Sequence, residues 1–303
     1  MILLWGVEAD GPLTAVRQAL EKRAAPLMFL DQRRAAETEI DLCVGTDVAG
    51  EIRLGEQRCD LAKITGVYVR GGDTRAVADG ASTDKTIERH AENLDEAVTA
   101  FLEATPACIV NPFEAMATNG SKPYQLALIR AQGFSTPDTL IATEPGAVME
   151  FLARHGELVY KSVSGVRCIV SRLSPGHLER LEDIRWCPTQ FQEYVPGRDY
   201  RVHVVGDAIF ACEIVSEAVD YRYATRAGEE VELNATAIPT SVADRCRALA
   251  AALGLVVAGV DLRLTPGGEW YCFEVNPSPA FTYYESATGL PIANAIAALL
   301  AGD

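Results

Sequence analysis

Residues 257–280 read VAGVDLRLTPGGEWYCFEVNPSPA and contain the most informative pattern in the chain. Strand-forming residues alternate with polar ones on both sides of the turn sequence PGGE, which predicts a β-hairpin. Strand side chains repeat every two residues, so Asp261 and Arg263 are expected on one face of the first strand. Glu274 and Asn276 are expected on one face of the second. The apolar side chains should lie on the other faces: Val260, Leu262, Leu264, Phe273 and Val275.

This hairpin brings two carboxylates and an amide oxygen together on facing strands, in an apolar setting. Hard oxygen ligands at that density suit Mg²⁺ or Mn²⁺ held together with the phosphates of a nucleotide. We therefore predict that Asp261, Glu274 and Asn276 are metal ligands. The alternative is a solvated hairpin face with ordinary charges, which the apolar character of the other strand positions disfavours.

The motif also resembles a known protein family. A strand-borne Asp followed on the next strand by Glu-x-Asn and then Pro-Ser-Pro is similar to the metal site of the ATP-grasp ligases, above all their glutathione-synthetase-like, RimK-type branch. The resemblance implies an α+β fold in three parts, with ATP between the last two. The expected parts are an N-terminal α/β domain over 1–110, a central lid domain over 111–190 and a C-terminal antiparallel-sheet domain over 191–303.

Composition limits the other possibilities. The 303 residues are 49% hydrophobic and carry a net charge of −15, so the chain is globular and repels nucleic-acid phosphates and anionic membranes. Its eight cysteines are scattered without a Cys-x-x-Cys pair, which favours reduced, buried thiols. We find no signal peptide and no apolar run of the roughly 18 residues that a membrane span needs. We therefore expect a cytoplasmic protein, and a homo-oligomer (a dimer).

The first 110 residues alternate strand and helix patterns, which predicts a small doubly wound α/β unit. The Gly71–Gly72 step follows a predicted strand, at the kind of sheet edge where such units bind ligands. Arg70 beside it is a candidate to contact a carboxylate substrate, and the alternative is a surface arginine in a turn. No GxGxxG opens this unit and the chain has no GxxxxGK[ST], so a Rossmann dinucleotide site and a P-loop are both disfavoured.

Two lysines of the central region are candidates for phosphate binding. Lys122 lies in the first turn of a predicted helix, where a cation opposes the helix dipole and suggests an anionic ligand. Lys161 lies in an apolar strand just before a Ser/Gly turn whose N–H groups could cradle phosphate. In this order they resemble the two ATP-phosphate lysines of the ATP-grasp enzymes. The loop KSVSGVR has fewer glycines than is usual in that family, so Arg167 is a candidate to replace part of its grip.

The segment FQEYVPGRDYRVHVVG, residues 191–206, resembles the hinge strand over adenine in the same family. By that resemblance Gln192 would meet the exocyclic amine of the base. The backbone of Glu193 and Val195 would pair with the ring edge, and Asp199 would bind the ribose hydroxyls. The alternative is an ordinary hairpin with a Pro-Gly turn.

The resemblance implies ATP-dependent carboxylate–amine (or hydroxyl) ligation, in which ATP phosphorylates a carboxylate and an amine or hydroxyl attacks the acylphosphate. Such chemistry needs bridging metal ions, and cations where charge develops. We assign Arg201 and Arg263 to this catalytic role. The alternative is that both pair with Asp199, Asp261 or Glu274 and hold the hairpin together.

The expected substrates are small-molecule or peptide carboxylates, amines and hydroxyls. Tyr283 and Tyr284 are candidates to line the acceptor pocket or simply to pack, and the polar loop 217–232 is a candidate to order over substrate. Two other functions stay open. One is a graspetide-type synthetase that closes rings on a ribosomal peptide, and the other is a nucleotide-binding regulatory protein without turnover, as in synapsin-like members of the fold.

Overall fold

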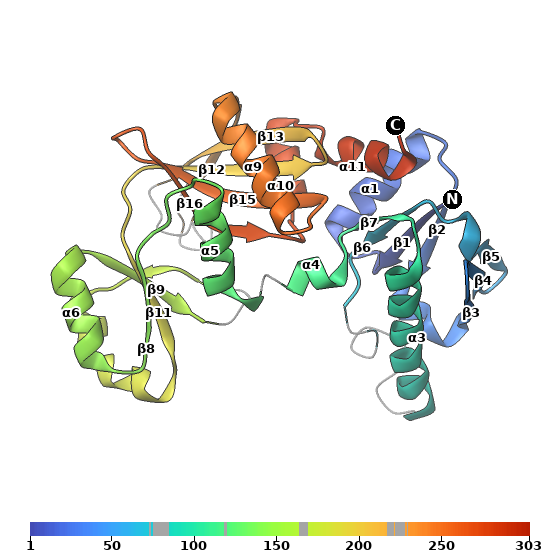
Figure 1. Cartoon of the computed structure of the whole chain (residues 1–303), viewed down its shortest axis with the longest axis horizontal. Helices are drawn as coiled ribbons and strands as arrows, with labels where there is room; N and C mark the ends of the chain where they lie inside the picture. The colour runs from blue at the N-terminus through green and yellow to red at the C-terminus, as the bar shows by residue number, and fades with distance from the viewer. Residues whose placement is uncertain are drawn as a thin grey trace.

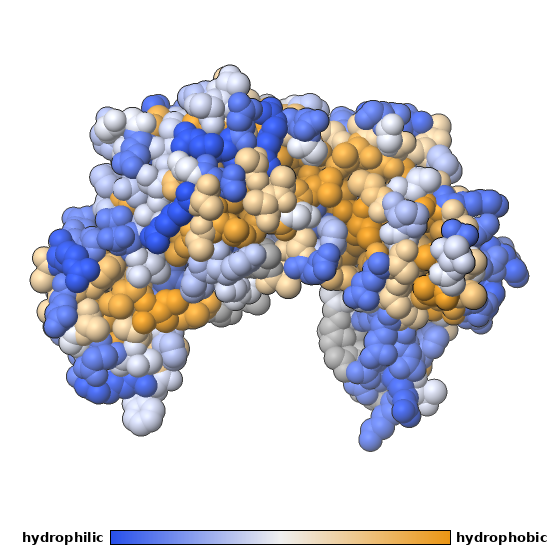
Figure 2. Space-filling model, viewed as in Figure 1, coloured by the Kyte–Doolittle hydropathy of each residue, from blue (hydrophilic) through white to orange (hydrophobic). Residues whose placement is uncertain are grey.

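Figure 1 shows the computed structural model of the chain, which describes residues 1–72, 74, 85–117, 120–163, 169–216, 221, 228 and 230–303. The molecule has the outline of an arch. A C-terminal sheet forms the top, a small sheet of residues 139–193, called the lid sheet, hangs at one end, and an N-terminal unit hangs at the other. Figure 2 shows the hollow between these two legs.

The N-terminal unit is built on a parallel four-stranded sheet in the order β2-β1-β6-β7. The strands are β1 (Ile2–Gly6), β2 (Leu27–Asp31), β6 (Gly66–Val69) and β7 (Cys108–Val110). Their short apolar sequences suit a parallel sheet that is covered on both faces. A separate antiparallel sheet packs beside it, with strands β3 (Thr38–Val44), β4 (Val48–Leu54) and β5 (Gln57–Asp60).

Helices cover both faces of the parallel sheet, so the predicted doubly wound arrangement is confirmed. Leu3 and Trp5 of β1 pack with α3 (Lys85–Ala104), whereas Ile2 and Leu4 pack with α1 (Gly11–Lys22) and α11 (Ile292–Ala301). The last helix of the chain therefore covers the first sheet. The approach is close: a β-carbon added to Gly66 would lie 2.6 Å from the carbonyl oxygen of Leu300.

The lid sheet is antiparallel, in the order β10-β9-β11-β8. Its strands are β8 (Thr139–Ala142), β9 (Leu158–Ser162), β10 (Ser171–Arg172) and β11 (Thr189–Glu193). One face packs on α6 (Pro145–His155), α7 (Pro175–Leu178) and η4 (Leu181–Trp186). By strand alternation, the other face carries Val159, Lys161, Gln190 and Gln192.

The C-terminal sheet is antiparallel, in the order β14-β13-β12-β15-β16. Its strands are β12 (Arg198–Val205), β13 (Ala208–Val215), β14 (Glu232–Thr236), β15 (Val257–Leu264) and β16 (Trp270–Asn276). Val202 and Val260 lie in a core that α5 (Lys122–Ala131) and α9 (Thr240–Ala252) close. The opposite face carries the polar residues of β12 and β15. The other described elements are η1 (Gln32–Glu37), η2 (Leu61–Lys63), α4 (Phe113–Ala117) and α10 (Thr282–Thr288).

Helix α5 belongs to the C-terminal core rather than to the core of the lid. Leu126 and Ile129 pack with the strands of the C-terminal sheet. Gln125 binds the edge strand β16 through both ends of its amide, to the Val275 carbonyl at 2.8 Å and the Val275 N–H at 3.2 Å. This helix thus occupies part of an otherwise open sheet edge. The domain boundaries at residues 110 and 190 stay a prediction.

The hairpin of β15 and β16 forms as predicted, with one difference in register. Asp261 lies opposite Glu274, but Leu262 pairs with Cys272, so Phe273 is the extra residue of a β-bulge. A bulge interrupts the alternation of side chains. Phe273 therefore lines the same cavity as Glu274, and Cys272 takes the core position. Our prediction that Phe273 lies on the apolar face was wrong.

Two expectations from composition can be compared with the described residues. Every cysteine in this part of the chain is a free thiol, four of them buried and two, Cys43 and Cys187, exposed. None of the helices described has both the length and the apolar composition that a membrane crossing requires.

Candidate active site

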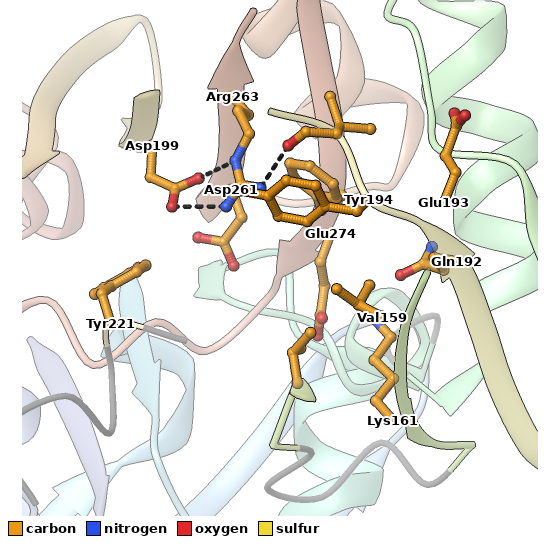
Figure 3. Close-up of a pocket in the computed structure, with 13 residues that line it drawn as sticks. Val159, Lys161, Gln192, Glu193, Tyr194, Asp199, Tyr221, Asp261, Arg263 and Glu274 are labelled. Atoms are coloured by element: carbon orange, nitrogen blue, oxygen red, sulfur yellow. Dashed lines mark hydrogen bonds and ion pairs between the residues drawn. The ribbon is translucent and has the colours of Figure 1, made fainter. Parts of the chain in front are cut away.

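A cavity of about 100 Å³ lies between the lid sheet and the C-terminal sheet (Figure 3). Most of the predicted site residues line it: Lys161, Gln192, Glu193, Val195, Asp199, Asp261, Arg263 and Glu274. They come from segments that are far apart in sequence, β9, β11, β12, β15 and β16. The fold therefore brings the hinge candidates, one lysine and both candidate metal carboxylates to one place.

A second cavity, of about 330 Å³, adjoins the first. Both are lined by Asp261 and Glu274, so these two carboxylates stand between them. The rest of the second lining is Arg201, Asn276, Ala280, Tyr283 and Tyr284. Tyr283 and Tyr284, the candidates to line an acceptor pocket, therefore both lie at a cavity. We call the two spaces the hinge-side cavity and the tyrosine-side cavity.

The candidate metal ligands lie together where Asp261 of β15 faces the end of β16. Glu274 accepts a hydrogen bond from the Lys122 ammonium at 3.2 Å, and the Asn276 amide oxygen accepts one from the Ser278 N–H at 2.9 Å. Over the described residues, no three His, Cys, Asp or Glu side chains gather as a self-sufficient metal site. Mg²⁺ prefers oxygen ligands and is commonly bound by one or two carboxylates plus substrate phosphates. This donor set fits that arrangement.

Two ion pairs cross between β12 and β15 in register. Arg201 lies opposite Asp261, and Asp199 lies opposite Arg263. The Arg201–Asp261 distance is 2.5 Å, and Arg263 binds both oxygens of Asp199 at 2.7 and 2.8 Å. Both arginines are thus paired, which is the geometry of the alternative in which they hold the hairpin together.

The two arginines differ in how many of their donors are engaged. Arg263 also donates to the Val195 carbonyl at 2.7 Å and lies 5.2 Å from the centre of the Phe273 ring. Figure 3 shows it directed at Asp199 and the hinge. Burial lowers the pKa of Arg263, but hydrogen bonding and charge from Asp199 outweigh it and raise the pKa above its ordinary value. Arg263 is therefore a permanently charged tie between the hinge and β15.

Arg201 is more deeply buried and less fully bonded. Its side chain is 6% exposed, its Nε has no hydrogen-bond partner among the described residues, and its guanidinium lies 5.7 Å from the centre of the Tyr284 ring. A β-carbon at Gly259 would lie 2.3 Å from Arg201 Nη2, so the missing side chain at this position makes room for the guanidinium. Sequence reasoning did not single out Gly259, because its neighbour across the sheet is invisible in sequence.

His203 lies behind Arg201 on the same face of β12. It is fully buried, neither ring nitrogen has a hydrogen-bond partner, and its ring centre lies 5.1 Å from that of Tyr284. Burial, and then the charge of Arg201, hold the pKa of His203 well below its usual value. The imidazole is therefore neutral at physiological pH.

A pair of tyrosine hydroxyls connects the two cavities. Tyr221 lines the hinge-side cavity and Tyr284 the tyrosine-side cavity, and their hydroxyl oxygens are 2.7 Å apart. Burial and the charge of Asp261 raise the pKa of Tyr221 well above 10, so this hydroxyl stays protonated. The predicted substrate loop 217–232 otherwise lies largely outside the described residues, and Tyr221 was not singled out in the sequence.

The amide of Gln192 has a fixed orientation. Its Nε2 lies 2.9 Å from Thr139 Oγ1, and that hydroxyl donates its own proton to the Pro137 carbonyl at 3.0 Å. The threonine oxygen must therefore accept from the Gln192 NH₂ group. The Gln192 carbonyl oxygen is left on the cavity side, as Figure 3 shows. This oxygen is a suitable acceptor for an amine.

The hinge backbone is only partly available to a base. The Glu193 N–H donates to the Asp138 carbonyl at 3.1 Å, and the Val195 carbonyl accepts from Arg263. A base can thus pair only with the Glu193 carbonyl and the Val195 N–H. The Glu193 carboxylate accepts from the Asp138 N–H at 3.0 Å and lies 3.4 Å from His155, which ties the hinge to the lid.

The remaining predicted cations have different places. Lys161 is buried on β9 and lines the hinge-side cavity, while Lys122 reaches Glu274 from α5. Arg167 lies outside the described residues. Arg70 binds both oxygens of Asp10, at 3.1 and 2.8 Å, and donates to the Ser278 hydroxyl. Arg70 therefore joins the N-terminal sheet to the Pro-Ser-Pro segment, which neither of our two readings anticipated.

Comparison with known proteins decides the family. The family described as the RimK-like ATP-grasp domain matches residues 121–300. The chain belongs to the RimK-like ATP-grasp family. A probable α-L-glutamate ligase of Sodalis glossinidius is 31% identical over 210 residues, which is 65% of this chain and 69% of that protein. A Xanthomonas oryzae protein of the same name is 30% identical over 66% of this chain and 70% of its own length.

Solved structures extend the likeness of this RimK-like chain to its full length. The ATP-grasp ligase PsnB, solved in complex with minimal precursor, is 27% identical to this chain with a TM-score of 0.81, and the match covers 99% of this chain and 98% of that PsnB chain. The macrocyclase MdnC of Microcystis aeruginosa, bound with the precursor peptide MdnA, has a TM-score of 0.83 at 24% identity over 100% of this chain, which shows the shared fold.

These findings confirm the predicted ATP-grasp fold and the enzyme class. This RimK-like chain is an ATP-dependent ligase that forms a C–N or ester bond with release of ADP, and ATP and Mg²⁺ are its cofactors. A solved structure of PsnB contains Mg and ADP together with minimal precursor.

Proposed function

We propose that this RimK-like ligase joins a carboxylate of a peptide to an amine or hydroxyl. The observation that carries the proposal is the tyrosine-side cavity beyond Asp261 and Glu274. Among the described residues of its lining there is one cation, Arg201, which is already paired with Asp261. A free glutamate would bring a second carboxylate beside the reacting one, and that group would lack a counter-charge. A side-chain carboxylate presented by a peptide does not have this cost.

The full-length likeness to PsnB supports the same substrate class. That likeness covers 99% of this chain, whereas the Sodalis glossinidius relative matches 65% of it. PsnB was solved with a precursor peptide. The N-terminal unit is therefore shared with a peptide-modifying ligase at the level of structure.

In this proposal the candidate metal ligands and the two lysines have separate roles. When bound, ATP would supply the phosphoryl group that activates the carboxylate, and Mg²⁺ would neutralise charge on the phosphates. Asp261, Glu274 and Asn276 hold the metal. Lys161 from the lid and Lys122 from α5 neutralise phosphate charge.

Arg201 is the catalytic arginine in this proposal, because it lines the tyrosine-side cavity and its buried Nε has no hydrogen-bond partner among the described residues. It stabilises the oxygens on which charge develops during transfer. Arg263 is placed as a positioning residue that fixes Asp199 and the hinge. Asp199 then takes the ribose, and its oxygens accept from Arg263 on one side.

Adenine recognition is proposed for the hinge. The Gln192 carbonyl oxygen accepts from the exocyclic amine, while the Glu193 carbonyl and Val195 N–H meet the ring edge. Guanine presents a carbonyl at the place of that amine, so two acceptors would oppose each other. The arrangement selects ATP over GTP.

Ligation of free glutamate is the second candidate function. It is favoured by the printed names of the relatives that match at 30–31% identity. In that case the acceptor would be the end of a peptide or protein, and the tyrosine-side cavity would hold a free amino acid.

The test uses the purified enzyme, ATP, Mg²⁺, free glutamate and a pool of synthetic peptides that contain Glu and Asp together with Ser, Thr and Lys at varied spacing. Mass spectrometry should show peptides that have lost one water for each bond formed, with matching ADP release. Glu274→Gln should abolish both while circular dichroism stays unchanged, because the amide keeps the shape of the side chain but removes the ligand charge. Peptides that gain a glutamyl residue and lose no water would reject the proposal in favour of the second candidate.

A further inference from the structure

A third cavity, of about 530 Å³, lies between α5, the lid strands β8 and β11, and α6. It shares no lining residue with the hinge-side or the tyrosine-side cavity. Its size is within the usual range of about 300–1,000 Å³ for ligand sites. Its lining combines polar and apolar side chains: Pro123, Leu126, Ala127, Arg130, Asp138, Thr139, Ile141, Phe151, Arg154 and Gln190. We call this space the α5–lid cavity.

The lining of this cavity includes a buried hydrogen-bond acceptor, the side-chain oxygen of Gln190. The residue is 1% exposed on β11, and its Oε1 has no hydrogen-bond partner in the structure. Buried polar atoms of native proteins are almost always hydrogen-bonded, so an exception asks for an explanation. Gln190 lines the cavity, so a rotation of its amide would bring this oxygen to an N–H group of a bound ligand.

Two arginines at the rim give it a positive charge. Arg130 donates through Nε to the Thr136 hydroxyl at 2.6 Å. In the described part of the chain neither Arg130 nor Arg154 forms an ion pair, although Arg53 alone contacts three carboxylates. The single carboxylate in the lining, Asp138, lies 3.7 Å from His155. In a chain of net charge −15, two unpaired arginines at one cavity attract an anion.

We propose that the α5–lid cavity binds an acidic peptide segment. Such a segment carries the three features that the lining matches: carboxylates for Arg130 and Arg154, backbone N–H groups for Gln190, and aliphatic carbons for the apolar wall of Leu126 and Ile141. A small inorganic anion would satisfy the arginines and leave the Gln190 oxygen and the apolar wall unused.

The position of the cavity gives such binding a consequence. Helix α5 is fixed to the C-terminal sheet through Gln125, whereas β8, β11 and α6 belong to the lid. A peptide held between them links the lid to the sheet beside the reaction site. The inference rests on the proposed function only in naming a peptide as the ligand, and its test needs no turnover.

The test is fluorescence anisotropy with a labelled hexapeptide of alternating Glu and Leu at low salt. Arg130→Gln combined with Arg154→Gln should weaken binding at least about tenfold, which corresponds to about 1.4 kcal/mol. Gln190→Met should also weaken it. The matched control combines Arg23→Gln with Arg58→Gln, two arginines of the N-terminal unit. It has the same net charge as the Arg130→Gln, Arg154→Gln variant but should bind the hexapeptide like the wild type. Thermal stabilisation by ATP should be unchanged in all three variants, which shows that each variant is folded.

Two results would overturn the inference. One is equal binding of the hexapeptide by the double variant and the wild type. The other is that inorganic phosphate or free glutamate displaces the labelled hexapeptide at concentrations as low as those at which unlabelled hexapeptide displaces it. That result would make this a small-anion site. Failure of ring closure with intact hexapeptide binding would count against the proposed function and leave this inference standing.

Discussion

At the scale of single residues, Arg201 and Arg263 are chemically alike but differently bonded. Among the described residues the buried Nε of Arg201 has no hydrogen-bond partner, whereas Arg263 donates to Asp199 and to the Val195 carbonyl. Arg201→Ala should lower kcat by about 10²–10³, the usual loss for one electrostatic contact to the transition state, with little change in the Kd for ATP. Arg263→Ala should instead lower Tm and weaken ATP binding together.

Three measurements on the same two variants check this difference: Kd for ATP, Tm and the rate of ADP release. Equal losses in all three for Arg201→Ala would contradict its catalytic role. A selective loss of rate in Arg263→Ala, with Tm intact, would return that residue to the catalytic assignment.

His203 should make stability depend on pH. In the unfolded chain a histidine binds a proton near pH 6.5, whereas burial and the neighbouring Arg201 hold the folded pKa of His203 well below that value. The unfolded state therefore gains the proton first as pH falls. The free energy of unfolding should decrease below about pH 6.5, by up to about 1.4 kcal/mol per pH unit.

Urea unfolding of the wild type and of His203→Gln across this pH range measures the effect. The variant should show a shallower slope, and His177→Gln, a change at an exposed lid histidine, should not alter it. A variant slope as steep as that of the wild type would assign the acid sensitivity to other groups.

At the scale of elements, the register of β12 on β15 sets the position of the guanidinium. Gly259→Ala would place a β-carbon 2.3 Å from Arg201 Nη2 and push the guanidinium aside. We expect kcat to fall on the order of 10²-fold, as small displacements of catalytic groups do, with ATP affinity retained. The rate loss should be non-additive with Arg201→Ala, because both changes act on one interaction.

Gly267→Ala is the control for this substitution. It lies in the turn of the same hairpin, where a β-carbon meets nothing closer than Thr265 Oγ1 at 3.7 Å. Its kcat should match the wild type. Fully additive losses for Gly259→Ala and Arg201→Ala would show that the glycine acts elsewhere.

The elements also show where strand periodicity failed. Alternation put Asp261, Arg263, Glu274 and Asn276 on the site side, but it put Phe273 on the wrong one. The cause is the bulge opposite β15, which adds one residue to β16 and shifts the phase of the pattern. No local signal in WYCFEVN marks that position.

At the scale of the whole molecule, the hinge-side cavity lies between two sheets. A bound nucleotide should therefore stabilise the packing of the lid on the C-terminal unit. ATP with Mg²⁺ should raise Tm measurably, since a hundredfold excess over Kd adds about 2.7 kcal/mol, and GTP should raise it much less. Gln192→Leu should reduce the ATP shift, and Gln132→Leu, at the partly exposed C-cap of α5, should not. Equal shifts with both nucleotides would contradict the adenine assignment.

The arch is held together by contacts between its first and last residues. Helix α11 joins β1 and β6 in one core with Val205 and Val257 of the C-terminal sheet, and Figure 2 shows apolar residues gathered where these parts meet. The side chain of Asn111 adds four hydrogen bonds to this junction, two of them to the Val257 backbone. The predicted dimer, cytoplasmic location and lack of nucleic-acid binding stay predictions.

The sequence alone determined the strands, the hairpin and the family, because alternation, turn residues and the order of motifs are local properties of a chain. It also named eight of the residues that line the hinge-side cavity, but not Tyr221. Tertiary structure decided what each of them touches. The crossed pairs of Arg201 with Asp261 and Arg263 with Asp199, the clearance at Gly259 and the contact of Tyr221 with Tyr284 depend on register between strands distant in sequence. Register is fixed by the packing of the whole sheet, which no single segment encodes.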